Sequence, residues 1–398
     1  MTVFRPDTPE QTAEAVRWAL SSEAPLEILG QGSKRGLGRP AEAEHGLDLS
    51  GLSGVIAYEP EELILTARAG TPMAEILPLL AGRRQQLAFE APDYGPLYGE
   101  PAGRGTLGGL IAAGLAGPRR IKDGAARDHT LGLEAVNGRG ELYRCGAKVV
   151  KNVTGYDVPK LLAGSFGTLS VLTEVTVKVL PAPETAATLV LSGRDDPRGV
   201  AALGAALRSP YEVSGAVHLP APVTARSAVA RVAGAGTALT LVRVEGFGPS
   251  VGARVAALKE ELGCDGVLDV GETVLLWAEL RDVVCFLQPD TLLWKLSVAP
   301  AEAARVAEAI RAAATADLFY DWGGGLLWVS VPDAASAPAI RAAVGSGHAT
   351  LVRAPDTVRT AVGAFHPPAE PVLALSRRVK AAFDPRGLFN PGRMYAGV

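Results

Sequence analysis

The stretch from Gly105 to Gly117, GTLGGLIAAGLAG, decides how we interpret this chain. It holds five glycines in thirteen residues, separated by small or apolar residues and one threonine, and it carries no charge. Glycine allows a backbone to approach a ligand closely and to adopt angles that other residues avoid. A surface of such glycine and alanine residues, with few protruding side chains, suits a large, flat, mostly apolar ring system. The basic residues Arg119, Arg120 and Lys122 follow at once and place charge for an anionic group beside it.

A second glycine loop lies near the N-terminus, where a predicted strand over Leu26–Leu29 leads into GQGSKRGLG, Gly30–Gly38. A strand followed by a glycine loop indicates phosphate binding through successive backbone N–H groups. It is not the Rossmann fingerprint, because the third glycine comes one place late and Gly36–Pro40 cannot begin the required helix. It also lacks the Gly-Lys-Ser/Thr ending of a Walker A loop. Such a loop is often a plain turn, and it becomes informative through its pairing with the first stretch.

Length and composition limit the possible classes of protein. With 398 residues, 48% hydrophobic and 20% charged, the sequence is typical of a globular enzyme of two domains. A net charge of -3 does not indicate binding to nucleic acid or to an anionic membrane surface. The start lacks a signal peptide, and the longest uncharged run is shorter than the roughly 20 residues of a membrane helix. We expect a cytoplasmic protein, with membrane association through partners as an open alternative.

The metal-binding residue types are sparse and scattered. The three cysteines, Cys145, Cys264 and Cys285, lie far apart, so they cannot form a disulfide framework or a four-thiolate iron–sulfur or zinc site. None of the five histidines has a second histidine at metal-ligand spacing. The sequence therefore predicts no metal centre.

The N-terminal domain is predicted over residues 1–182. Thr8-Pro9-Glu10-Gln11 begins a helix that runs to about Ser21, and Thr71-Pro72 begins another through Leu80. The turn Asn137–Gly140 indicates a hairpin. Strands are predicted over Leu47–Leu49, Val55–Tyr58, Leu63–Ala69, Gln86–Phe89, Leu131–Val136, Glu141–Arg144 and Leu169–Val179.

The sequence pattern changes after Pro181 and Pro183, where a domain boundary is predicted. Residues 183–368 alternate strands such as Leu239–Val244 and Leu326–Val331 with amphipathic helices over Val251–Leu262 and Ala301–Ala314. This favours an α+β module of antiparallel strands with helices on one side. The tail, 369–398, is predicted to be a helix to Phe383 and a fixed turn that return to the N-terminal domain.

Four elements occur in order along nearly the whole chain: GQGSKRGLG, GTLGGLIAAGLAG, KNVTGYDVPKLLAGSFGTLSVLTEVTVKV and FDPRGLFNPGRM. Together they resemble the FAD-binding family typified by vanillyl-alcohol oxidase and p-cresol methylhydroxylase. The resemblance implies an α+β fold, with a two-subdomain FAD-binding domain and an antiparallel α+β cap domain. Phe166, where catalytic relatives usually carry an acid, and Asp321-Trp322-Gly323-Gly324-Gly325 are most similar to the FAD-binding E subunits of bacterial glycolate oxidases.

The resemblance also implies a cofactor and the residues that hold it. Gly30, Gln31, Gly32, Ser33 and Lys34 would offer N–H groups to the pyrophosphate of FAD. Residues lining the pyrophosphate and ribityl chain would be Gly105, Thr106, Leu107, Gly108 and Gly109, with Ala112 and Ala113 beside the flavin. Gly167 and Val171 would lie near the adenine end and Asn390 near the isoalloxazine. Ser33 stands where some relatives carry a His or Cys tethered to flavin, so noncovalent FAD is expected.

Oxidation of a 2-hydroxy acid on FAD requires a cation for the carboxylate and a base for the hydroxyl proton. Arg119 is our candidate catalytic cation, with Arg120 and Lys122 as neighbours, and Tyr156 is the candidate beside the ring. Alternatively, these cations pair with Asp123 and Asp128, and Tyr156 is a packing aromatic. The paired histidines that catalytic relatives bring toward substrate are missing from the sequence.

Three hypotheses remain open. In the first, the chain is the FAD-binding subunit of a glycolate or related 2-hydroxy-acid oxidase or dehydrogenase, and it works with a catalytic flavoprotein sister subunit and an iron–sulfur subunit. The second is a self-sufficient FAD oxidoreductase of a small hydroxy acid or alcohol, and the third a flavin fold retained as an assembly scaffold.

Overall fold

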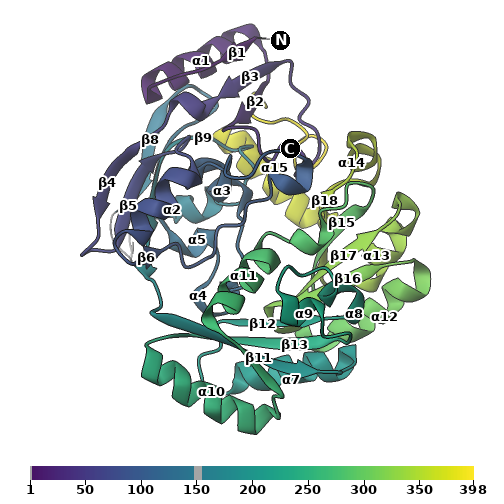
Figure 1. Cartoon of the computed structure of the whole chain (residues 1–398). Coiled ribbons are helices and arrows are strands. Elements are labelled where there is room, and N and C mark those ends of the chain that lie inside the picture. The colour runs from purple at the N-terminus through teal and green to yellow at the C-terminus, as the bar shows by residue number, and fades with distance from the viewer. Residues whose placement is uncertain (1, 148–154) are drawn as a thin grey trace. The chain divides into compact units, whose positions relative to one another are not determined.

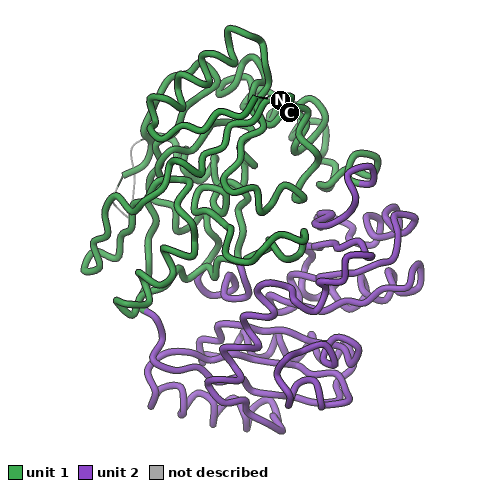
Figure 2. The backbone as a smooth tube through the Cα atoms, turned by 45° about the horizontal axis from the view of Figure 1, so that its top comes forward, with its two compact units in different colours: residues 1–116, 124–181, 359–398 green, residues 117–123, 182–358 purple. Residues whose placement is uncertain are grey.

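The computed structural model describes residues 2–147 and 155–398, and the chain forms two compact units (Figure 2). Unit 1 comprises residues 1–116, 124–181 and 359–398, and unit 2 comprises residues 117–123 and 182–358. Apart from a one-residue shift at Ala182, this division differs from the predicted one in two places. Residues 117–123 belong to unit 2, and the C-terminal part of unit 1 begins ten residues before the predicted position 369. Residues 117–123 come shortly after the end of the glycine-rich helix. That helix ends at Gly114, which has the left-handed conformation of a C-cap with a φ of 62°.

The first part of unit 1 is a parallel sheet in the order β1 (Val3–Phe4), β3 (His45–Asp48), β2 (Leu26–Leu29), with helix α1 (Pro9–Ser22) beside it (Figure 1). The Thr8 side chain accepts a hydrogen bond from the Gln11 N–H, and Pro9 is the first helical residue. This local chemistry starts the helix where the sequence predicts it. Buried apolar residues of α1, β2 and β3 form one core cluster with Phe389 of the tail.

The second part of unit 1 is an antiparallel sheet in the order β4 (Val55–Glu59), β5 (Ile64–Arg68), β9 (Val171–Lys178), β7 (Thr130–Val136), β8 (Leu142–Gly146). Strands β7 and β8 form the predicted hairpin, in which the Asn137 Oδ1 accepts hydrogen bonds from the N–H groups of Arg139 and Glu141. The helices of this region are α2 (Met73–Ala81), α3 (Leu107–Ala113), α5 (Ala126–His129) and α6 (Val158–Leu162).

The predicted strand over Gln86–Phe89 is mostly wrong. Strand β6 is only Gln85–Gln86, paired with β10 (Leu180–Pro181). Residues 87–89 are buried, and the chain turns at Glu90, whose φ is 49°. Their apolar character reflects a buried connection and not a sheet.

Unit 2 is built on an antiparallel sheet. Within its described residues the strand order is β14 (Gly266–Leu268), β11 (Thr185–Ser192), β13 (Leu239–Gly246), β12 (Gly215–Leu219), β16 (Asp317–Asp321), β17 (Leu326–Val331), β15 (Leu292–Ser297), β18 (His348–Arg353). Its longer helices are α7 (Asp196–Arg208), α10 (Gly248–Leu262), α11 (Val270–Arg281), α12 (Ala303–Ala313) and α13 (Ala337–Ala343). The helices α4 (Arg120–Asp123), α8 (Ala221–Thr224) and α9 (Ala230–Ala233) are single turns.

The helices of unit 2 cover both faces of this sheet, which corrects the prediction of helices on one side. Leu189 and Leu191 of β11 pack with buried residues of α7 and α10. The side chains of Thr188 and Val190 point the other way, because successive residues of a strand face opposite sides. Thr188 accepts a hydrogen bond of 2.9 Å from the indole of Trp277 in α11. Figure 1 shows α11 and the pair α7 and α10 on opposite sides of the strands.

The tail closes unit 1. Helix α14 (Asp356–Val362) leads to α15 (Glu370–Phe383), and the turn after α15 runs beside β2, where the Leu26 N–H donates to the carbonyl of Leu388 at 2.8 Å. Lys380 reaches back to donate to the carbonyls of Thr168 and Phe389. In the described part of the chain, no helix is both long enough and apolar enough to cross a membrane.

Candidate functional site

A cleft lies within unit 1. Four segments that are distant in the sequence line it: the loop after β2, the first turns of α3, the residues leading into β9, and the C-terminal turn. The lining residues are Ile28, Leu29, Gly30, Gln31, Gly32, Ser33, Lys34, Arg35, Leu37, Leu49, Ala69, Thr106, Gly108, Gly109, Ala112, Ala113, Phe166, Gly167, Ser170, Leu172, Asn390 and Arg393. The two glycine segments therefore meet at one cleft.

Three of the predicted cofactor residues do not line the cleft. Leu107 is fully buried in the packing under α3, and Gly105 instead accepts a hydrogen bond from the Met73 N–H. Val171 is fully buried in the core cluster that contains α1, whereas its neighbours Ser170 and Leu172 line the cleft. Because side chains alternate along a strand, Val171 faces away from the cleft that its two neighbours line, and its assignment to the cofactor stays a prediction.

The two loops touch at their glycines. A Cβ added to Gly30 would stand 2.5 Å from the Thr106 Oγ1, and one added to Gly109 would stand 3.7 Å from the Lys34 Nζ. Gly32 has a φ of 74°, which favours glycine. Backbone thus forms this part of the wall, and a side chain at Gly30 or Gly109 would meet the facing segment.

The cleft carries an excess of positive charge. The Lys34 Nζ donates to the Ser33 Oγ at 3.3 Å, and among the described residues no carboxylate forms an ion pair with it. Burial lowers the pKa of Lys34 to about 8, although the charge of Asp93 opposes this shift. Arg393 donates to the Lys34 carbonyl at 3.1 Å, and burial lowers the pKa of Arg393 to about 10 while Glu27 opposes that shift. These groups favour an anionic ligand.

Asn390 joins two walls of the cleft. Its Oδ1 accepts a hydrogen bond of 2.8 Å from the Ile28 N–H, and its Nδ2 donates to the Phe166 carbonyl at 2.7 Å. A Cβ on Gly167 would stand 2.8 Å from the same Nδ2. Asn390 and Gly167 are therefore neighbours on the cleft wall. The assignments of Gly167 to the adenine end and of Asn390 to the isoalloxazine stay predictions.

Sequence reasoning missed ten lining residues. Most of them are flanking residues of the glycine segments or of strands β2 and β9, and strand alternation would have found some. The long-range members had no local signal: they are Arg393 in the tail, Leu49 after β3 and Ala69 after β5.

Comparison with known proteins places this geometry in a family. Residues 2–146 match a family described as "FAD binding domain". The glycolate oxidase subunit GlcE of Escherichia coli (strain K12) is 35% identical over 394 residues, which cover 98% of this chain and 98% of that protein. The chain belongs to the GlcE family. The glycolate oxidase subunit GlcD of Bacillus subtilis (strain 168) is 33% identical over 46% of this chain and 38% of its own length.

Solved structures agree on the fold of this GlcE family member. p-Cresol methylhydroxylase with substrate bound has a TM-score of 0.72 at 15% identity, over 98% of this chain and 88% of that one. 4-Ethylphenol oxidase from Gulosibacter chungangensis has the same TM-score and identity, over 99% and 89%. These similarities confirm the predicted α+β fold of the vanillyl-alcohol oxidase and p-cresol methylhydroxylase type.

The cleft residues fit FAD. The bare loops offer main-chain N–H groups beside Lys34, which suits a pyrophosphate. The apolar side chains of Ala112, Ala113 and Leu172 suit an aromatic ring system on the same surface. The GlcE family chain therefore has, in one unit, both kinds of surface that the dinucleotide requires.

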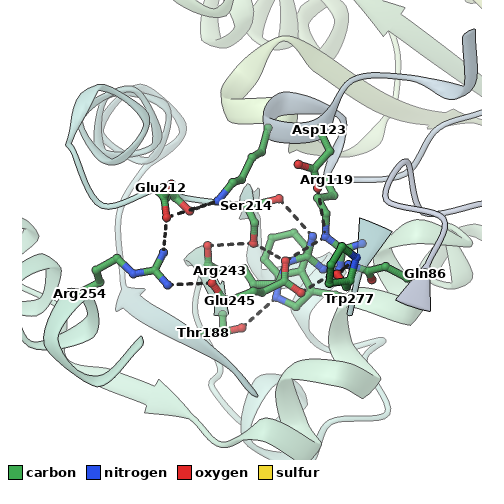
Figure 3. Close-up of polar contacts among 12 residues, drawn as sticks. Gln86, Arg119, Asp123, Thr188, Glu212, Ser214, Arg243, Glu245, Arg254 and Trp277 are labelled. Carbon is green, nitrogen blue, oxygen red and sulfur yellow. Dashed lines mark hydrogen bonds and ion pairs between the residues drawn. The ribbon is translucent and has the colours of Figure 1, made fainter. Parts of the chain in front are cut away.

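Arg119, a predicted catalytic residue, lies in unit 2, and its guanidinium is held by Glu245. The two residues form two parallel hydrogen bonds of 3.0 and 2.8 Å (Figure 3). Arg243 contacts the same carboxylate at 3.2 Å and lies over the ring of Trp277 at 4.3 Å. Arg119 is only 8% exposed. The geometry gives Arg119 a structural contact, and its catalytic role stays a prediction.

Tyr156, the second predicted catalytic residue, is 94% exposed. It does not line the cleft. The preceding residues Lys151–Thr154, part of the motif that suggested Tyr156, lie outside the described residues. The structure thus brings neither predicted catalytic side chain to the cleft wall, and the role of Tyr156 also stays a prediction.

The other cations after the glycine helix also have partners in unit 2. Arg120 lies over the Trp322 ring at 4.3 Å, and Lys122 forms an ion pair of 3.8 Å with Glu212. His218 is fully buried between Asp196 and Thr240. Within the described ranges, no group of three His, Cys, Asp or Glu side chains could hold a metal ion.

The Arg119–Glu245–Arg243 cluster makes the free energy of unfolding depend on pH in the acidic range. Burial alone would raise the pKa of Glu245, but Arg243 and Arg119 hold it lower, at about 2. A carboxylate whose pKa is depressed in the folded state contributes stability above its unfolded pKa, and loses it as the pH falls toward the folded value. We expect Glu245→Gln to lower the free energy of unfolding at pH 7 by about 3–5 kcal/mol, because two buried cations lose the carboxylate that both contact, and Arg119 then has Asp123 at 3.9 Å.

Urea denaturation at several pH values measures this effect. The difference between the native protein and Glu245→Gln should shrink as the pH falls from about 4.5 toward 2. Glu302→Gln, which alters an exposed ion pair with Arg305, is the matched control and should change stability by at most about 1 kcal/mol. A constant difference across this pH range would contradict the assigned pKa.

Proposed function

We propose that this chain is the FAD-binding subunit of an oxidase or dehydrogenase complex that acts on glycolate or a related 2-hydroxy acid. The observation that carries the proposal is the cleft between Gly30–Lys34 and Thr106–Gly109, in a chain similar to GlcE over its whole length. In this proposal the pyrophosphate lies against those two segments, with Lys34 as the nearby cation.

We propose that FAD is held without a covalent bond. Covalent attachment needs a nucleophilic side chain at the flavin. The described residues that line the cleft include no Cys, His or Tyr. Ser33 is buried, and its hydroxyl is within hydrogen-bonding distance of Lys34. Binding would rest on main-chain hydrogen bonds, charge and apolar contact.

When bound, FAD supplies the capacity to accept a hydride from the 2-hydroxy acid and to release electrons one at a time. The residues of this chain hold the cofactor, orient it and exclude water from its apolar part. Onward transfer needs a partner, because the three cysteines are dispersed and unpaired, and burial raises the pKa of each thiol. This supports the proposed association with an iron–sulfur subunit and a catalytic flavoprotein sister subunit.

The alternative is a self-sufficient oxidoreductase of a small hydroxy acid or alcohol. It is favoured by partial similarity to enzymes named D-lactate dehydrogenase, for example 29% identity to that of Anaerostipes hadrus over 46% of this chain and 37% of that protein. In the present chain the engagement of Arg119 by Glu245 favours the subunit proposal, because the cation predicted for substrate is already paired.

Anaerobic addition of glycolate to the purified chain tests the proposal. We expect bound FAD to stay oxidised, and therefore to keep its visible absorbance, until sister subunits are added. The absorbance should then decrease as the flavin is reduced. Bleaching of the isolated chain would support the self-sufficient enzyme. A colourless protein that takes up no FAD when it is titrated would leave only the scaffold hypothesis. A heat-denatured sample with added FAD is the control for free flavin.

A further inference from the structure

Ser170 contributes a hydroxyl to the wall of the cleft in unit 1, just before strand β9 begins. Leu172, two residues further on, lines the cleft from the same side of the chain. Ala69, which also lines it, is joined to this strand by a hydrogen bond of 3.0 Å from its N–H to the Thr173 carbonyl. The side chains of Ser170, Leu172 and Ala69 are all buried. A ligand that fills the cleft therefore meets an enclosed hydroxyl with apolar neighbours.

The register of the antiparallel sheet brings Tyr143 to this hydroxyl. Tyr143 of β8 pairs with Ala135 of β7, and Ala135 pairs with Leu172 of β9. Residues directly opposite on neighbouring strands share a face, so Tyr143 lies on the face of the sheet from which Leu172 lines the cleft. The Tyr143 Oη is 2.8 Å from the Ser170 Oγ. Tyr143 therefore sets the orientation of the Ser170 hydroxyl.

In this pair the phenol is the better donor, because a phenol is a stronger acid than an alcohol. Burial raises the pKa of Tyr143 to about 12, so its hydroxyl keeps the proton at neutral pH. A serine hydroxyl has one proton and two lone pairs. When the Ser170 Oγ accepts from Tyr143, its own proton is left for another acceptor. Among the described residues, the Ser170 hydroxyl makes no further hydrogen bond, so the ligand in the cleft is left to accept that proton.

The backbone before Ser170 is held in place from two sides. Phe166 and Gly167 have φ values of 55° and 68°, and the Thr168 carbonyl accepts a hydrogen bond of 2.6 Å from the Lys380 Nζ. A positive φ at a large residue such as Phe166 is costly, and conformations of this kind cluster at ligand sites. The hydroxyl of Ser170 is thus preorganised before a ligand binds.

We propose that Ser170, oriented by Tyr143, donates a hydrogen bond to a ring nitrogen of the adenine of FAD and so favours the dinucleotide over FMN. This inference rests on the proposed function, and it names the half of the cofactor that this part of the cleft holds. Adenine is a flat, uncharged ring whose isolated nitrogens accept hydrogen bonds, which suits one enclosed hydroxyl with apolar neighbours. The isoalloxazine instead carries two carbonyls and an N–H along one edge and needs several polar partners. Ser170 therefore determines specificity, and Tyr143 acts through it as a positioning residue.

Parallel titrations of the full-length chain, freed of flavin, with FAD and with FMN test the role of Ser170. Ser170→Ala should weaken FAD binding about 5–10-fold, the effect of one lost hydrogen bond, and should leave the FMN affinity within about twofold. Ser21→Ala, which removes an exposed hydroxyl of α1, is the matched control and should change neither affinity. Equal weakening of FAD and FMN would place the hydroxyl at the flavin half and overturn the proposal. Unchanged FAD affinity in Ser170→Ala would also overturn it.

Tyr143→Phe tests the positioning role, because it removes the hydroxyl and keeps the ring beside Phe383. It should weaken FAD binding about 2–3-fold without changing the FMN affinity. The double variant Tyr143→Phe/Ser170→Ala should bind FAD no more weakly than Ser170→Ala, and additive losses would show that Tyr143 does not act through Ser170. Tyr58→Phe is the control, because that phenol donates to Gln85 at 2.7 Å and does not line the cleft. If Ser170→Ala does not fold, the ratio of FAD to FMN affinity in Tyr143→Phe decides.

Competition by ADP separates this inference from the proposed function, because ADP carries the adenine and the pyrophosphate without the flavin. ADP should displace FAD from the native protein, and its affinity should fall about 5–10-fold in Ser170→Ala. If the native protein takes up FAD and the ADP affinity is the same in both, the adenine assignment is wrong while the proposed function stands. If the native protein takes up no FAD, the proposed function fails, and this inference survives only if ADP binds and binds more weakly to Ser170→Ala.

Discussion

A Gly109→Glu variant is expected to purify with an intact fold and without FAD. A Cβ at this position would stand 3.0 Å from the Thr106 Oγ1 and 3.7 Å from the Lys34 Nζ. The added carboxylate would therefore enter the cleft beside its main cation, occupy the path of the pyrophosphate and neutralise the charge that attracts it. We expect FAD affinity to fall at least about 100-fold, or about 2.8 kcal/mol.

The measurement is the ratio of flavin to protein absorbance after desalting, followed by FAD titration with circular dichroism as the check on folding. Gly252→Glu is the matched control, because a Cβ there meets nothing within 4 Å on the exposed side of α10. It should retain FAD fully. Normal occupancy in Gly109→Glu would show that this cleft does not hold the cofactor.

The adjacent glycine distinguishes ligand contact from packing. A Cβ on Gly108 would stand 2.6 Å from the Ala69 Cβ and 2.8 Å from its carbonyl oxygen. Gly108→Ala would thus push α3 away from the end of β5 and destabilise the protein by the roughly 1–3 kcal/mol of an overpacked core. Loss of FAD in that variant alone would say little about the binding surface, whereas its loss in Gly109→Glu reports on the cleft itself.

The features that the sequence predicted well are those encoded within a few residues. The cap of α1 by Thr8, the hairpin at Asn137 and the loop after β2 each depend on a side chain and its near neighbours. The resemblance extended this to the whole chain, because its four motifs fixed the order of the two glycine segments and the tail. The meeting of the two loops at one cleft followed from that order.

The features that it missed depend on contacts between distant segments. Val171 is apolar and β9 is buried on both sides, so the pattern could not say which neighbours face the cleft. Arg119 and Glu245 are 126 positions apart, and no local signal predicts their pairing. The contact of Asn390 with the Phe166 carbonyl joins residues 224 positions apart, and no local signal predicts it.

A Lys380→Met variant is expected to lose both stability and FAD affinity. Lys380 is 7% exposed, and its Nζ donates to the carbonyls of Thr168 and Phe389 and to the Asp384 carboxylate. Asp384 in turn is 1% exposed and accepts from the N–H groups of Leu388 and Phe389. Methionine would leave a buried carboxylate without its cation, which costs about 3–5 kcal/mol of the free energy of unfolding.

The loss reaches the cleft through the tail. The turn held by Lys380 and Asp384 carries Asn390, whose side chain joins Ile28 to Phe166 across the cleft wall. Loosening this turn makes the wall less ordered before FAD binds, so part of the binding free energy must be spent on ordering it. We therefore expect a weaker FAD affinity together with a lower denaturation midpoint.

Urea denaturation with and without FAD measures both effects. Lys160→Met is the matched control, because Lys160 forms an exposed pair with Asp157 one turn along α6 and should cost at most about 1 kcal/mol. The double variant Lys380→Met/Asp384→Asn should be less destabilised than the sum of the two single variants, since it removes the uncompensated charge. Additive costs would contradict the coupling, and unchanged stability in Lys380→Met would show that the tail is held by its apolar packing alone.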